Sequence, residues 1–282
     1  MPAERIAANL AFINWTVLTG LAVGSFGAVV LARLRTDATR GFMVFTAFCA
    51  VALGALALAS DLGLPRALAA GPVVADPTFD VPRRVALGAF CALGLVTVLA
   101  LMRGARATGV GVAGGIAGLL ALVGGALTWG GGAFGGTPLA IQLIVLAAVT
   151  GGVFAAMILG HWYLVTPRLP EAPLVLFART LLALVALQLL LAVVWLATRA
   201  GPGAGGSGTG PFGALVGPWA LFVWLRLIIG LGFPLVVSWA AVQTARSRSM
   251  ESATGLLYIN VGAIAAGTIL AAGLYFGAGL LV

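Results

Sequence analysis

The stretch LAFINWTVLTGLAVGSFGAVVL, residues 10–31, decides the fold class of this chain. It holds no charged side chain, and Arg33, Arg35 and Arg40 follow it. A transmembrane helix needs about 20 predominantly apolar residues, whereas the apolar core of a signal peptide is shorter. We therefore predict that this stretch is the first transmembrane helix and not a cleaved signal.

The composition extends this prediction to the whole chain. Apolar residues make up 62% of the 282 residues and charged residues only 8%, with a mean hydropathy of +1.16. Soluble domains carry roughly a quarter charged residues, so this chain lacks the charge to cover a surface in water. We predict a single integral membrane domain over residues 1–282, with the lipid bilayer as its main partner.

Eight segments are long and apolar enough to cross a bilayer. They are predicted near residues 9–33, 41–61, 85–103, 109–129, 138–162, 174–198, 213–242 and 253–281. The fold class is therefore all-α, a polytopic transmembrane helix bundle.

The arginines predict the orientation of the bundle. The loops after the first, third, fifth and seventh spans hold eight arginines, and the opposite side holds five. Because cytoplasmic loops are enriched in basic residues, both termini are predicted on the outer (periplasmic or extracellular) side. The expected location is the bacterial cytoplasmic (inner) membrane.

Several binding classes are disfavoured by residue usage. The net charge of +8 comes from 15 arginines without any lysine. These arginines are scattered over short loops and do not form the basic stripe of a nucleic-acid-binding face. Cys49 and Cys91 are expected to be free thiols, since their predicted depths are too far apart for a disulfide. No set of His, Cys and carboxylate residues predicts a metal site.

Small residues predict how the helices pack. The pairs Gly20/Gly24, Gly111/Gly115, Gly114/Gly118 and Gly273/Gly277 are each spaced by four residues. This spacing leaves a flat strip on which two helices approach closely in lipid. The segment from Gly230 to Pro234 is expected to bend or break the seventh span, because proline lacks an N–H and clashes with the preceding turn.

Ionisable and polar side chains inside the spans are the functional candidates, because such residues are costly in lipid. His161 is the only histidine, and it closes the fifth span. A short turn follows it, so we predict that it faces Arg179 of the next span. With Tyr163, these two residues are expected to form a polar cluster near the cytoplasmic face. Tyr258 and Asn260 are expected at a similar depth. Arg226 is predicted about 20 Å from either end of its span, without a carboxylate at its depth.

These residues favour a quinone site over the other cofactors considered. A quinone needs an apolar slot for its tail and hydrogen-bonding groups for its carbonyls, and an imidazole can carry the accompanying proton. A single histidine excludes bis-histidine haem ligation within the chain. The hypothesis is a membrane subunit of a respiratory electron-transfer complex, with a quinone pocket formed by the candidates named above and no metal centre of its own.

In helix number and scarcity of cofactor ligands, the chain resembles the NrfD/PsrC-like membrane subunits of bacterial respiratory complexes. The resemblance is architectural, and no motif matches residue by residue. It implies partner subunits. Two alternatives stay open: a transporter that binds an anionic solute at Arg226 beside the broken seventh span, and a passive membrane anchor packed against other subunits.

Overall fold

The computed structural model describes residues 1–166, 169–203 and 210–282, apart from the side chains at 133–134. Within these ranges eight helical spans are long and apolar enough to cross a membrane, which confirms the predicted all-helical, multi-pass architecture. The helices are α1 (Pro2–Ala8), α2 (Leu10–Arg35), α3 (Arg40–Leu62), α4 (Asp80–Met102), α5 (Thr108–Trp129), α6 (Ala133–Val165), α7 (Ala172–Thr198), α8 (Ala220–Leu227), α9 (Phe233–Arg246) and α10 (Met250–Ala278). Large apolar side chains such as Leu190, Val236 and Ile259 are exposed on these spans and face lipid.

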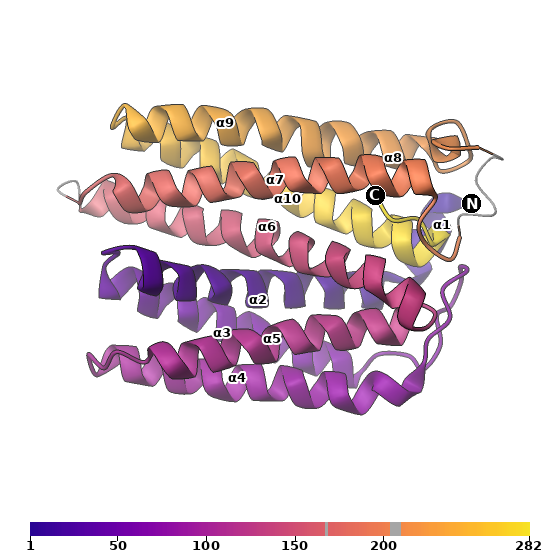
Figure 1. Cartoon of the computed structure of the whole chain (residues 1–282), viewed down its shortest axis with the longest axis horizontal. Helices are drawn as coiled ribbons and strands as arrows, with labels where there is room; N and C mark the ends of the chain where they lie inside the picture. The colour runs from indigo at the N-terminus through magenta and orange to yellow at the C-terminus, as the bar shows by residue number, and fades with distance from the viewer. Residues whose placement is uncertain (167–168, 204–209) are drawn as a thin grey trace.

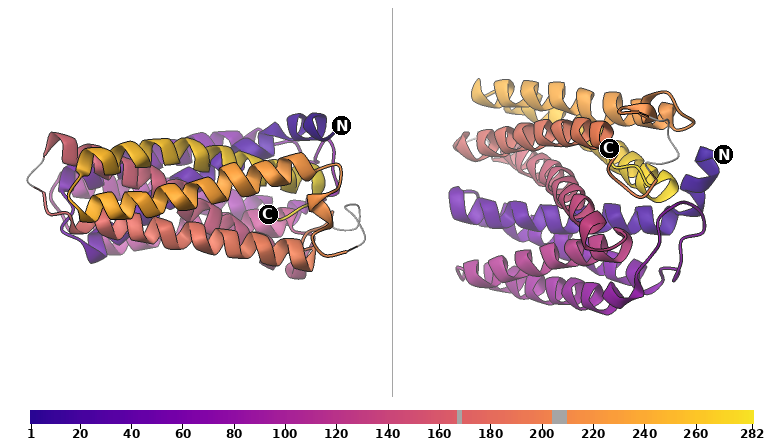
Figure 2. Two further views of the ribbon diagram at one scale, coloured as in Figure 1. Left: turned by 90° about the horizontal axis from the view of Figure 1, so that it is seen from above. Right: turned by 45° about the vertical axis from the view of Figure 1, so that its right-hand side comes forward.

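The spans form two groups joined by α6. Helices α2 to α5 pack together on one side, and α7 to α10 pack together on the other. Helix α6 leans from one group to the other and contacts α2, α5, α7 and α10 (Figures 1 and 2). We call the end of the bundle that holds both chain ends the terminal end, on the right in Figure 1. The opposite end is the arginine end, where α2 and α9 finish.

The predicted spans agree with the observed helices within five residues at every end but the start of the seventh span. Helix α4 begins at Asp80, so Arg83 lies in its first turns and not in a loop. The 3₁₀ turn Pro77–Phe79 leads into α4, and the Asp76 carboxylate accepts a hydrogen bond from the N–H of Thr78 at its start. The seventh span begins at Ala220, because Gly213–Leu215 form a separate 3₁₀ turn and Pro218 precedes the helix.

Glycine permits the closest helix contact in the bundle, between α2 and α6. A Cβ atom on Gly24 would overlap the carbonyl oxygen of Ala147, and one on Gly151 would overlap the backbone nitrogen of Ser25. The two backbones therefore touch, as the Gly20/Gly24 spacing predicts. Gly273 and Gly277 likewise pack against Ile6 and Trp219.

The remaining glycine pairs lie on α5. Gly111, Gly114 and Gly118 contact side chains of α2 and α4, whereas Gly115 faces open space. Three of these four glycines therefore serve the predicted packing role.

The seventh span is continuous, and a π-helical turn at Ile228–Gly232 joins α8 to α9. Pro234 lies just after this turn and has no N–H to donate to the carbonyl of Gly230. The wider turn accommodates the proline without breaking the helix, so the predicted break is a local change of helical pitch. Close packing of Gly230 against Gly267 holds this turn on α10, since a Cβ on either would lie 2.6 Å from the other's Cα.

Candidate functional site

His161 and Tyr258 form a pair near the arginine end of the bundle. The Tyr258 hydroxyl lies 3.3 Å from Nδ1 of His161, and the two rings meet edge to face with centroids 6.5 Å apart. Which group donates depends on the tautomer of the imidazole. Gly160 brings α6 against α10 at this level, because a Cβ there would lie 2.8 Å from the Thr254 hydroxyl oxygen. The sequence of α6 thus positions its histidine beside α10.

Both members of this pair are open to the surroundings. Tyr258 is 48% exposed and His161 is also exposed. His161 lies four residues before the end of α6, which is about 6 Å along the helix axis. The pair therefore lies toward the arginine end of the bundle and is open to molecules that approach from its side.

The other residues predicted near His161 make no hydrogen bond with it. Tyr163 is buried, and its hydroxyl donates to the carbonyl of Pro170 in the turn after α6. Arg179 is exposed and makes no hydrogen bond or ion pair with any residue that the structure describes. The amide of Asn260 is buried and donates to the hydroxyl of Ser238, 2.8 Å away. The predicted cluster therefore reduces to the pair of His161 and Tyr258.

Arg226 is buried in the α7–α10 group, with 1% of its surface exposed. Its Nη1 donates to the carbonyl of Gly230 at 3.0 Å, and its Nε donates to the carbonyl of Val282 at 3.4 Å. The first of these carbonyls is the one left without a partner by Pro234. Among the described residues, Nη2 has no partner.

The segment after α10 completes this site. Gly279 adopts a left-handed conformation, and the following residues are buried against the bundle. The amide of Gln142 donates to the Val282 carbonyl at 2.9 Å and accepts from the indole N–H of Trp195 at 3.2 Å. Arg226 lies six residues from the start of α8, about 9 Å along the axis, so its predicted depth of about 20 Å is wrong.

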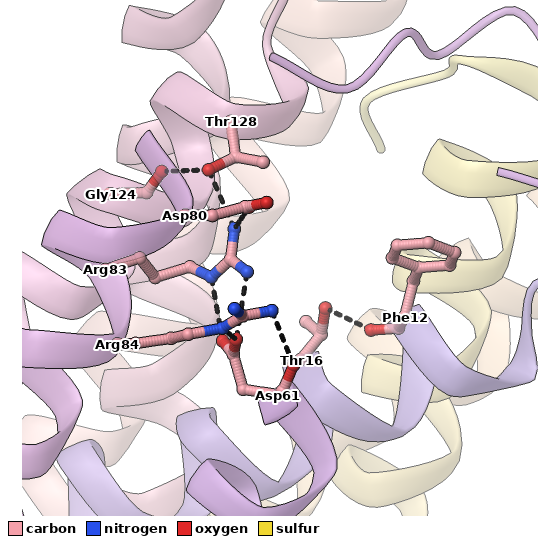
Figure 3. Close-up of polar contacts among 8 residues, drawn as sticks. All are labelled: Phe12, Thr16, Asp61, Asp80, Arg83, Arg84, Gly124 and Thr128. Carbon is pink, nitrogen blue, oxygen red and sulfur yellow. Dashed lines mark hydrogen bonds and ion pairs between the residues drawn. The ribbon is translucent and has the colours of Figure 1, made fainter. Parts of the chain in front are cut away.

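A buried ionic cluster occupies the terminal end of the α2–α5 group, and sequence reasoning missed it (Figure 3). The carboxylate of Asp61 receives two hydrogen bonds from Arg83, at 2.7 and 3.0 Å, and one from Arg84 at 2.7 Å. Nη1 of Arg83 donates to Asp80 at 2.9 Å and to the hydroxyl of Thr128 at 2.8 Å. We call this group the Asp61–Arg83 cluster.

The cluster is enclosed by aromatic rings and small residues. Arg83 and Asp61 have 1% and 0% of their side-chain surface exposed. The guanidinium carbon lies 4.8 Å from the ring centroid of Trp129 and 5.7 Å from that of Trp15, a cation–π arrangement. A Cβ on Gly124 would lie 3.0 Å from that of Arg83, so glycine makes room for the arginine on α5. This cluster fixes α3, α4 and α5 to one another.

An apolar cavity of about 240 Å³ lies between α2, α5, α6 and α7. Gly27 and Leu31 of α2, Gly152 of α6 and Phe177 of α7 contribute to its wall. The hydroxyl of Thr180 is the only polar side-chain group among the lining residues. The cavity suits a hydrocarbon chain.

Within the described ranges, no group of three or more His, Cys, Asp or Glu side chains is placed to hold a metal ion. What the arrangement offers is a hydrogen-bonding pair that can exchange a proton at the membrane interface. Comparisons with protein-family models, curated proteins and solved structures find no match to the chain.

Proposed function

We propose that this chain is the membrane subunit of an electron-transfer complex in the bacterial inner membrane, and that it binds the headgroup of a quinone or quinol. The observation that carries the proposal is the exposed pair of His161 and Tyr258 at interface depth. Quinone headgroups partition to this depth when their tails lie among lipid chains. An imidazole N–H and a phenol O–H both donate to a quinone carbonyl.

The pair suits the proton half of quinol oxidation. When a quinol becomes a quinone, two O–H bonds break, and two protons and two electrons leave. His161 accepts a proton at whichever ring nitrogen faces the quinol hydroxyl, and Tyr258 holds the imidazole in place through its hydrogen bond. The proposal assigns the second proton to water at the surface of the bundle, and the two electrons to a haem or iron–sulfur centre of a partner subunit.

The two alternatives have less support from the contacts. An anion transporter would use Arg226 to bind its solute, but two of its three nitrogens donate to carbonyl oxygens of the chain. Those contacts favour a structural role in closing the π-helical turn. A passive anchor predicts that no bilayer quinone binds at all, and the experiment below tests that alternative.

The proposal is tested with the protein reconstituted in nanodiscs that contain a quinone with a photoreactive headgroup. Labelling is expected on the segments around His161 and Tyr258. The variants His161→Gln and Tyr258→Phe should weaken quinone binding about fivefold to tenfold, the range given by losing one hydrogen bond. Peptide mapping by mass spectrometry and competition with unlabelled quinone provide the readouts.

Gln243→Ala is the matched control, because Gln243 is an exposed polar residue of α9 toward the same end of the bundle. It should label like the unmodified chain. Labelling that is absent, or that is spread evenly over the lipid-facing surface in all variants, contradicts the quinone proposal and supports the anchor.

A further inference from the structure

The cavity between α2, α5, α6 and α7 and the arginine beyond it together span about the depth of one membrane leaflet. Its wall on α2 runs from Val23 to Leu31, and Arg35 follows one turn later at the end of the helix. Val23 and Arg35 are about 18 Å apart along the axis. Half of a hydrocarbon core of about 30 Å is about 15 Å. The cavity thus extends from the middle of the membrane toward the headgroup region at the arginine end.

The cavity wall is shaped by missing side chains. Gly27 and Gly152 both line it, and a Cβ atom built on either would meet no heavy atom within 4 Å. The cavity is therefore free of other atoms next to both α2 and α6. Since the lining is apolar except for Thr180, the preferred content is a flexible hydrocarbon chain and not water.

Arg35 supplies a positive charge at the open end of this space. Residues four apart lie on one face of a helix, and side chains lean toward its N-terminus. Arg35 therefore lies over Leu31, on the face that lines the cavity. It is exposed and has no hydrogen bond or ion pair within the described part of the chain.

The charged residues near Arg35 in the sequence do not pair with it, so its guanidinium can bind a ligand. Nε of Arg33 donates to the carbonyl of Arg106, on the side of α5. Arg40 lies against Gly104, beyond α4. Asp37 is the nearest acidic residue in the sequence, and it forms no ion pair with a described residue.

We propose that the cavity binds one acyl chain of an anionic glycerophospholipid from the leaflet at the arginine end, with the lipid phosphate at Arg35. Basic residues between transmembrane helices recognise anionic headgroups in this way. The length of the apolar cavity matches one acyl chain. The guanidinium of Arg35 lies at its open end, where the lipid phosphate would be. The proposal is independent of the quinone site, because His161 does not line the cavity.

The test is native mass spectrometry of the protein released from nanodiscs made of equal parts phosphatidylglycerol and phosphatidylcholine. The unmodified chain should retain one phosphatidylglycerol molecule. Gly27→Leu and Gly152→Leu should each lose it, because the added side chain fills the cavity without a clash. Arg35→Gln should keep a lipid but lose about fivefold in preference for the anionic headgroup.

Gly88→Leu is the matched control, since Gly88 also faces open space but lies on α4, away from the cavity. It should retain lipid as the unmodified chain does, and so should His161→Gln. Undiminished retention in the folded Gly27 and Gly152 variants overturns the proposal. Equal retention of both lipids by the unmodified chain, or a preference unchanged in Arg35→Gln, also overturns it.

Discussion

Arg83 and Arg226 are each buried to 1% exposure inside an apolar helix bundle, yet their surroundings differ in kind. Arg83 meets two carboxylates, a hydroxyl and two indole rings. Arg226 meets only backbone oxygens, of Gly230 and Val282, and one of its nitrogens lacks a partner in the described chain. The first arginine is held by side-chain carboxylates, and the second is held by backbone oxygens.

The difference shows that burial alone does not determine how much a charged residue inside the bundle contributes to stability. A buried ion pair becomes costly when one partner is removed, because the other charge then stays without compensation. Removing an arginine that is held by backbone oxygens leaves only those oxygens without a donor. The two arginines should therefore respond very differently to the same substitution.

The largest effect is expected for Arg83→Met. It leaves the buried carboxylate of Asp61 with Arg84 alone, and losing one partner of a buried pair costs about 3–5 kcal/mol. Unfolding of the purified protein in mixed detergent micelles, followed by its tryptophan fluorescence, measures the loss.

The double variant Arg83→Met with Asp61→Leu is the control, since it removes both charges together. Replacing a whole buried pair by apolar residues is often close to neutral, so the double variant should recover most of the stability. A double variant that is less stable than Arg83→Met contradicts the ion-pair account.

An intermediate effect is expected for Arg226→Met. The substitution leaves the carbonyl of Gly230 unsatisfied but also removes a desolvated charge, so the net loss should stay below about 2 kcal/mol. The same unfolding titration measures it. Combining Arg226→Met with Pro234→Ala restores an N–H near that carbonyl and should reduce the loss; a larger loss in the combination argues that Arg226 has a different role.

The smallest effect concerns Asp76, at the rim of the Asp61–Arg83 cluster. Its N–H donates to the carbonyl of Thr128, and its carboxylate binds Thr78, which holds the pKa of Asp76 below the ordinary value of 3.8. Because the pKa is lowered in the folded state, the stabilisation is present above 3.8 and is lost as the pH falls below it. The protection of amides 70–80 against hydrogen exchange, relative to the intrinsic rate at each pH, should decrease on acidification in the unmodified chain. In Asp76→Asn, which caps the turn at every pH, this protection should stay constant; an equal decrease there rules out Asp76 as the cause.

Hydropathy predicted the eight spans because lipid demands the same apolar length from each of them. Glycine spacing predicted the contact of Gly24 with α6, since a four-residue repeat fixes which face is flat. Patterns of this kind do not predict how each helix is rotated about its axis. Arg179 and His161 were expected to face each other, but the hydrogen bond that His161 makes is with Tyr258 of α10.

The Asp61–Arg83 cluster was missed because each residue alone resembles an interface charge. Asp61 ends one apolar run and Arg83 begins the next. Consecutive antiparallel helices place such positions at the same depth, and that is the signal that could have paired them. The cluster also depends on the room left by Gly124 and on the rings of Trp15 and Trp129, and these residues come from α5 and α2, outside the hairpin of α3 and α4.

The same cluster has a consequence for biogenesis. At the translocon, a lone arginine or aspartate near the centre of a helix raises the free energy of insertion by about 2.5–3.5 kcal/mol, and by less toward the helix ends. Asp61 and Arg83 neutralise each other only when α3 and α4 lie side by side. The hairpin of α3 and α4, and not either helix by itself, is therefore the unit that we expect to partition from the translocon into the bilayer.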